Sequence, residues 1–194
     1  MSKSIKFNKV PVEIPISELT PFNISCGSTK CEEGYHCFRM TPKQIEKKGE
    51  SGLCKSCGVS LIDWKRMNMR DSRDAKFIFA SLRNELFRHM YWHIKIDDEA
   101  LKLAAEIGPS GIAETAMMRM RDKIGIEKPY RKGITPYTGD VVYYAQHATA
   151  TCCRRCMQYW YNIPEGRALN AEELKFTTDL INLYVEERLP KLYI

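Results

Sequence analysis

The sequence has no long hydrophobic run, no low-complexity segment and no internal repeat. No stretch approaches the ~20 apolar residues that a membrane helix needs, and residues 1–19 lack the apolar core of a secretion signal. The sequence therefore predicts neither a membrane protein nor a secreted protein, and we expect the chain to be cytoplasmic. The H-x-E and P-C-x-x-C pattern of zinc deaminases is also missing, because position 149 is Thr and no proline precedes Cys153.

What is present is typical of a folded protein. The 194 residues are 44% hydrophobic and 28% charged, enough for one domain and a small extension. The formal charge of +6 is compatible with an acidic partner such as nucleic acid. Basic residues are densest over residues 65–76 and 119–132, which are equally typical of solvated helix faces.

The eight cysteines carry the strongest chemical signal. Cytoplasmic thiols are kept reduced, and clustered ones there bind metal or perform redox chemistry more often than they form disulfides. We therefore interpret them as ligands of zinc, and their two clusters predict two ions.

The expected fold is mainly α with a small β component: a helical domain preceded by a zinc-ribbon-like segment. Prolines suit residues 1–24 to an extended arm, and residues 25–60 hold five cysteines and almost no core-forming run. Such a segment needs a bound ion to fold. Residues 61–194 form the helical domain that carries the second site.

Within the helical domain, apolar spacing and stop signals predict helices around 61–69, 71–92, 97–107, 110–124 and 152–161. The run Val141 to Ala145 is the best strand candidate. Asn170 and Glu173 form the capping box of a last helix.

The amino-terminal cluster contains Cys26, Cys31, Cys37, Cys54 and Cys57. The C-x-x-C pair at 54 and 57 directs two sulfurs at one ion, and a second pair upstream completes a closed, structural site. Three cysteines compete for those two places, and the spacing favours Cys26 with Cys31. His36 is expected to be a packed or exposed histidine.

The second cluster contains His147, Cys152, Cys153 and Cys156, at the start of a predicted helix. His147, Cys153 and Cys156 with a vacant fourth place would suit a catalytic zinc. If Cys152, another histidine or an amino-terminal thiol fills that place, the site is structural. A redox C-x-x-C with lowered thiolate pKa is a rival interpretation. Further candidates beside the ion are Gln146, Thr149, Thr151 and Arg167.

From about residue 86 to 189 the chain resembles a family of small bacterial and phage proteins classed only as a domain of unknown function. The resemblance rests on Thr135-Pro136, Gly139, Val142, the run AQHATATCCRRC at 145–156, Trp160 and the run IPEGR at 163–167. Members often carry His at positions that hold Thr115 and Tyr161 here. The zinc-ribbon-like segment is an addition to the shorter family form, and the resemblance implies no particular activity.

Three functions follow as hypotheses. The leading one is a zinc-binding protein that acts on or beside nucleic acid. The second is a zinc-dependent enzyme with an open His/Cys/Cys site, although no general base stands in the motif. The third is a structural module that binds another protein.

Overall fold

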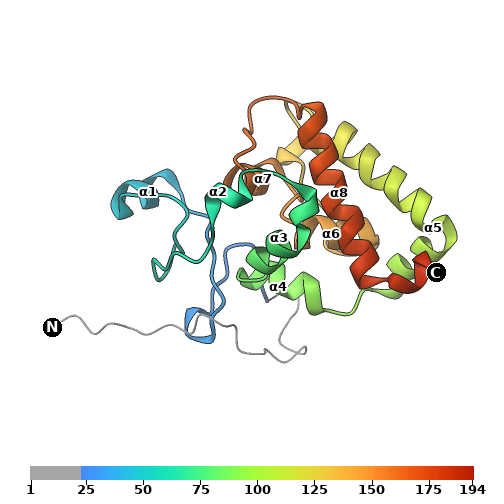
Figure 1. Ribbon diagram of the computed structural model, residues 1–194, viewed down its shortest axis with the longest axis horizontal. Coiled ribbons are helices and arrows are strands. Elements are labelled where there is room, and N and C mark those ends of the chain that lie inside the picture. Colours follow the sequence, from blue (N-terminus) through green and yellow to red (C-terminus); the bar gives the residue numbers. More distant parts are fainter. Residues whose placement is uncertain (1–22) are drawn as a thin grey trace.

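Helices dominate the part of the chain that the computed structural model describes, residues 23–194 (Figure 1). The helices are α1 (Pro42–Lys48), α2 (Trp64–Met67), α3 (Ala75–Leu82), α4 (Leu86–His93), α5 (Asp98–Arg119), α6 (Val141–Ala148), α7 (Arg154–Tyr161) and α8 (Ala171–Arg188). Single turns of 3₁₀-helix lie at Cys31–Glu33, Ser72–Asp74, Tyr130–Lys132 and Pro190–Tyr193, and a π-turn extends α5 over Met120–Ile124.

The β component is small, as expected. In residues 23–194 it consists of two isolated bridges, one between Lys30 and Tyr35 and one between His36 and Glu85. The mainly helical fold class is therefore confirmed. The predicted arm, residues 1–24, lies almost entirely outside the described residues.

Helix α6 is the centre of the helical domain, packed against α4, α5 and α8. The predicted strand at residues 141–145 was wrong. Asp140 caps the helix by accepting a hydrogen bond from the Val142 amide at 2.8 Å. Helix α6 is buried on nearly every side, and a short apolar run buried all round has no periodicity that separates helix from strand.

The structure divides the chain into helices differently from the prediction at two places. The helix expected over 71–92 is two, α3 and α4, because the chain bends to hydrogen-bond with His36: the His36 amide donates to the Asn84 carbonyl and the Leu86 amide to that of His36. The two helices expected at 97–107 and 110–124 run on as α5, with a kink at Gly108.

The amino-terminal segment shares its core with the helical domain. Phe38 is buried, and its ring lies 5.9 Å from those of Trp64 and Trp160. Helix α1 stands out at one end of the molecule, away from α5 and α8 (Figure 1). None of the helices in the described part of the chain is long and apolar enough to cross a membrane.

Candidate metal centres

The first candidate centre gathers four potential ligands, Cys31, His36, Cys54 and Cys57, whose ligand atoms all lie within 4.8 Å of one another. The sulfurs of Cys31 and Cys54 are 3.8 Å apart, and the Cys57 sulfur is 3.4 Å from His36 Nδ1. With metal bonds of about 2.3 Å to sulfur and 2.0 Å to nitrogen, tetrahedral zinc separates its ligands by about 3.6–3.8 Å. The residues therefore fit a four-coordinate ion.

Local backbone geometry selects these four residues. Tyr35 and His36 each form a β-bridge, and the side chains of the successive residues His36 and Cys37 have different partners. His36 faces the C-x-x-C turn, whereas the Cys37 thiol donates to the Cys26 carbonyl at 3.4 Å. The structure does not bring Cys26 or Cys37 into this group, and it places His36 where the spacing favoured Cys26.

The turn at Cys54 already favours a thiolate. Burial would raise the pKa of Cys54, but hydrogen bonds from His36 and from the backbone amides around the turn lower it to about 5. Gly58 adopts φ 79°, and its amide donates to the Cys54 carbonyl at 2.9 Å, which closes the tight knuckle. This geometry is what a metal-binding C-x-x-C turn requires.

The second candidate centre consists of Cys152, Cys153 and Cys156, again with all sulfurs within 4.8 Å of one another. Cys153 is the N-cap of α7, and Cys156 lies one turn along it. The hydrogen bond with Cys152 and burial raise the pKa of Cys153 to about 12. A redox C-x-x-C needs a lowered thiol pKa, so the raised value argues against redox chemistry. The grouping of three sulfurs is what points to a metal site.

Three thiols leave one place of a tetrahedral ion to be filled, and the structure does not bring His147 to it. Its Nε2 lies 3.0 Å from the Pro136 carbonyl, and its ring stacks with those of Tyr91 and Tyr137. Burial and Arg88 lower the pKa of His147 to about 3, so the ring is neutral.

The other candidate residues support the fold around the second centre. Gln146 accepts from Arg119 at 3.0 Å, and Thr149 donates to the Ala145 carbonyl at 2.7 Å. Thr151 lies 3.1 Å from Thr149, between their hydroxyl oxygens. Arg167 pairs with Glu173 of α8 at 2.6 Å.

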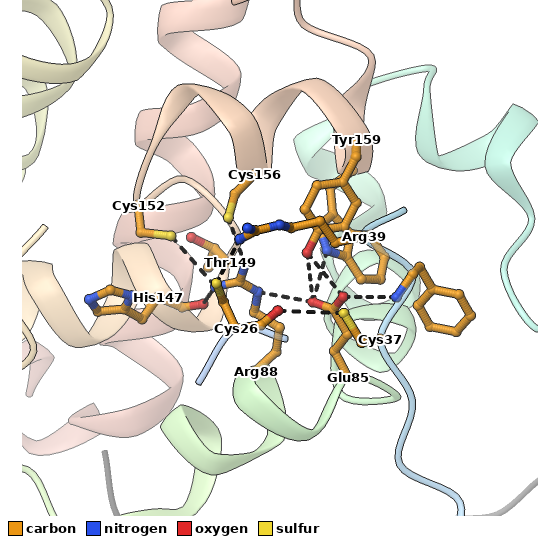
Figure 2. A network of polar contacts seen from close by, with 12 residues as sticks. Cys26, Cys37, Arg39, Glu85, Arg88, His147, Thr149, Cys152, Cys156 and Tyr159 are labelled. Atoms are coloured by element: carbon orange, nitrogen blue, oxygen red, sulfur yellow. Dashed lines mark hydrogen bonds and ion pairs between the residues drawn. The ribbon is translucent and has the colours of Figure 1, made fainter. Parts of the chain in front are cut away.

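Sequence reasoning missed a buried charge network beside the second centre (Figure 2). Arg88 is fully buried and donates to the Cys156 sulfur at 3.0 Å and to the His147 carbonyl at 2.6 Å. Its Nε lies 3.3 Å from Glu85. The position of the two residues could have indicated this network, because Glu85 and Arg88 lie one turn apart in a stretch whose apolar stripe was predicted to be buried.

A family described as "Domain of unknown function (DUF4186)" matches residues 76–186, more than half of the chain. The chain belongs to the DUF4186 family. The match includes α4 and α7, and so the whole second centre, whereas the first centre precedes it in the DUF4186 chain. No solved structure matches the chain.

Proposed function

We propose that this DUF4186 protein is a zinc-binding protein whose first ion is structural. The observation that carries the proposal is the set Cys31, His36, Cys54 and Cys57, which supplies four donors at tetrahedral separations. Three thiolates and one imidazole are soft ligands that suit zinc rather than calcium or magnesium. Four protein ligands leave no place for water, so the ion stabilises structure.

The first ion joins three parts of the chain. Cys31 lies on one short turn, His36 on the extended segment that bonds to Asn84, and Cys54 with Cys57 on a third loop. Residues 25–60 contain few apolar residues of their own, so metal binding would supply folding free energy for this segment.

The test is metal analysis of purified full-length protein. Cys54→Ser combined with Cys57→Ser should remove one zinc per chain, whereas Cys37→Ser, which removes a thiol outside both groups, should retain it. If the double variant keeps the zinc content of the wild type, the first centre is not a metal site.

A nucleic acid is the partner that we propose, and it would bind in a cleft of about 680 Å³ between the amino-terminal segment and α7. Aromatic rings, guanidinium groups, amides and one carboxylate line the cleft, among them Arg39, Trp64, Arg155, Gln158, Tyr159 and Glu165. Aromatic rings can stack on bases, and guanidinium groups can pair with phosphates. This combination favours single-stranded nucleic acid over an anionic small molecule.

The basic runs of the sequence support this proposal less than the cleft does. Arg66 pairs with Asp74, and Arg121 pairs with Asp122. Arg73 pairs with Asp71. These side chains neutralise their charge within their own segments. Arg155 also has a carboxylate, Glu165, at 4.0 Å, but in the cleft its guanidinium lies among aromatic rings, and it is this combination that supports a nucleic-acid partner.

Fluorescence anisotropy with labelled single- and double-stranded DNA and RNA at several salt concentrations tests the partner. Arg155→Ala should weaken single-strand binding and reduce the slope of log affinity against log salt by about one. Lys102→Ala removes an exposed cation of α5 and should change neither the single-strand affinity nor its salt dependence. Absence of binding at low salt would refute the nucleic-acid partner and leave the zinc proposal standing.

The enzyme hypothesis has weaker geometric support. It needs a histidine, two cysteines and a water on one ion, and His147 is turned toward Pro136. The second centre is better interpreted as a further zinc site built from thiols.

A further inference from the structure

Cys26 is a cysteine of the amino-terminal segment that the first centre does not use. The four ligands of the first centre are complete without it. Its sulfur instead accepts a hydrogen bond from Arg39 Nη1 at 2.8 Å, and its carbonyl accepts one from the Cys37 thiol. Both partners lie in the amino-terminal segment, so these bonds fix the position of Cys26 relative to Arg39 and Cys37.

The neighbouring guanidinium groups connect Cys26 to the second centre. Arg39 donates to the Cys26 sulfur, and its guanidinium also interacts electrostatically with Cys156 and Cys153. The Cys26 sulfur is not one of the three sulfurs that all lie within 4.8 Å of one another. Arg88 reaches the same centre from α4, through Cys156 at 3.0 Å and Cys152 at 3.6 Å. Figure 2 draws the Cys26 sulfur beside the ends of Arg39 and Arg88, on the side of Cys152 and Cys156.

We infer that Cys26 is the fourth ligand of a zinc ion held by Cys152, Cys153 and Cys156, so that this ion fastens the amino-terminal segment to the DUF4186 domain. The inference rests on the proposed zinc binding at the second centre. It commits to a closed site of four thiolates, and hence to a structural ion with no place for water.

The charge of such a site explains why two arginines surround it. Zinc with four thiolates carries a net charge of −2, which is costly to bury unless donors compensate it. Hydrogen bonds from Arg39 and Arg88 to sulfur provide that compensation, in the way that outer-shell partners tune metal sites. Binding requires the Cys26 sulfur to close on the three others while Arg39 remains its donor.

The same arrangement links the ion to the proposed nucleic-acid cleft. Arg39 lines the cleft and donates to Cys26, and Arg155 and Gln158 lie on α7, directly after the ligand Cys153. The two walls of the cleft belong to the two parts that the ion would join. Loss of the second ion should therefore weaken the binding of single-stranded nucleic acid, even when no side chain that lines the cleft is substituted.

The experiment is a cobalt and zinc titration of the full-length protein in competition with a chelator. Cys26→Ser should weaken one of two ions by at least about tenfold, the scale of losing even a supporting contact, and reduce the sulfur-to-cobalt charge-transfer absorbance. Cys37→Ser should match the wild type in metal affinity and in the charge-transfer absorbance. Cys26→His restores a nitrogen donor and should recover the ion with an altered cobalt spectrum, which separates ligation from a folding defect.

The outcomes separate this inference from the zinc proposal. If Cys156→Ser loses one ion while Cys26→Ser keeps two at wild-type affinity and spectrum, Cys26 is not a ligand, although the second centre is a metal site. If Cys153→Ser and Cys156→Ser both keep two ions, the second centre binds none and both proposals for it fail.

Discussion

Glu85 is a buried carboxylate on which donors from three parts of the chain converge. It accepts from the Phe38 amide at 3.0 Å, from the Tyr159 hydroxyl at 2.9 Å and from Trp160 Nε1 at 3.1 Å, and Arg88 lies beside it. The amino-terminal segment, α4 and α7 thus meet at one residue. A buried charge with so many donors is satisfied, but its removal breaks the ion pair with Arg88 and leaves the other donors facing a neutral group.

Glu85→Gln should therefore destabilise the protein by about 3–5 kcal/mol, the range for breaking a fully buried ion pair. Both side chains are at most 1% exposed, so solvent does not reduce the effect. Urea denaturation followed by circular dichroism measures it. Glu187→Gln removes an exposed partner of Arg83 and should cost less than about 1 kcal/mol; equal costs for the two variants would contradict the assigned role.

Glu173 has a related role at the start of α8. Hydrogen bonds from Arg167, with further support from the Asn170 amide and Arg70, lower the pKa of Glu173 despite its burial. A carboxylate with a lowered pKa stabilises the fold above its ordinary pKa of about 4.3, and this contribution is lost as the pH falls through the lowered value.

Glu173→Gln should cost roughly 1–3 kcal/mol at pH 7, less than a fully buried pair because both arginines are partly exposed. The difference from the wild type should shrink as the pH is lowered below about 4. Glu172→Gln, on the exposed side of the same turn, is the matched control. A cost that does not change with pH would show that the charge of Glu173 contributes nothing.

At the scale of elements, local signals predicted the chain where they act within one segment. The capping box of Asn170 and Glu173 starts α8 as expected, because both hydrogen bonds lie within four residues. Helix α6 was misread, since its burial depends on α4, α5 and α8, which the local pattern does not contain. The break between α3 and α4 depends likewise on His36, almost fifty residues upstream.

The same distinction applies to the candidate centres. The C-x-x-C pairs identified Cys54, Cys57, Cys153 and Cys156, because their spacing alone brings the sulfurs together. The choice of His36 over Cys26 depends on which way an extended segment faces, and spacing does not determine that. Arg39 and Arg88 reach the cysteines only through tertiary packing, so no motif marks them.

Helix α5 contains a conformation that only glycine adopts readily. Gly108 has φ 64° and ψ −178°, immediately before Pro109. Apart from its chain neighbours and the adjoining backbone of α5, nothing lies within 4 Å of the position of an added Cβ. Gly108→Ala should therefore lower stability by about 1–3 kcal/mol through backbone strain alone.

Thermal denaturation of Gly108→Ala measures that cost. Gly166→Ala is the matched control, because Gly166 also has open space around its Cα but no positive φ. We expect little change in its melting temperature. Equal melting temperatures for both variants would mean that α5 straightens at no cost.

For the whole molecule, a single core extends from the amino-terminal segment into the family domain. Tyr35 and Phe38 belong to the same buried cluster as Trp160 and Tyr184. The expected boundary at residue 60 therefore does not divide the described residues into two cores. Beyond the boundary, apolar packing of α5, α6 and α8 is extensive, whereas before it the thiol-rich loops have few apolar residues to bury.

Metal removal should expose this difference in the wild-type protein. Hydrogen exchange after zinc chelation should show loss of protection over residues 25–60 and at the start of α7, where the two proposed ions bind. Helices α5, α6 and α8 should retain their protection, because they pack on one another, bury residues such as Ala104, Val142 and Ile181, and carry none of the proposed ligands. Added zinc should restore the wild-type pattern. If the loops and helices instead lose protection together on chelation, the ions stabilise the whole fold cooperatively, and the amino-terminal segment is as much a part of the domain as its helices.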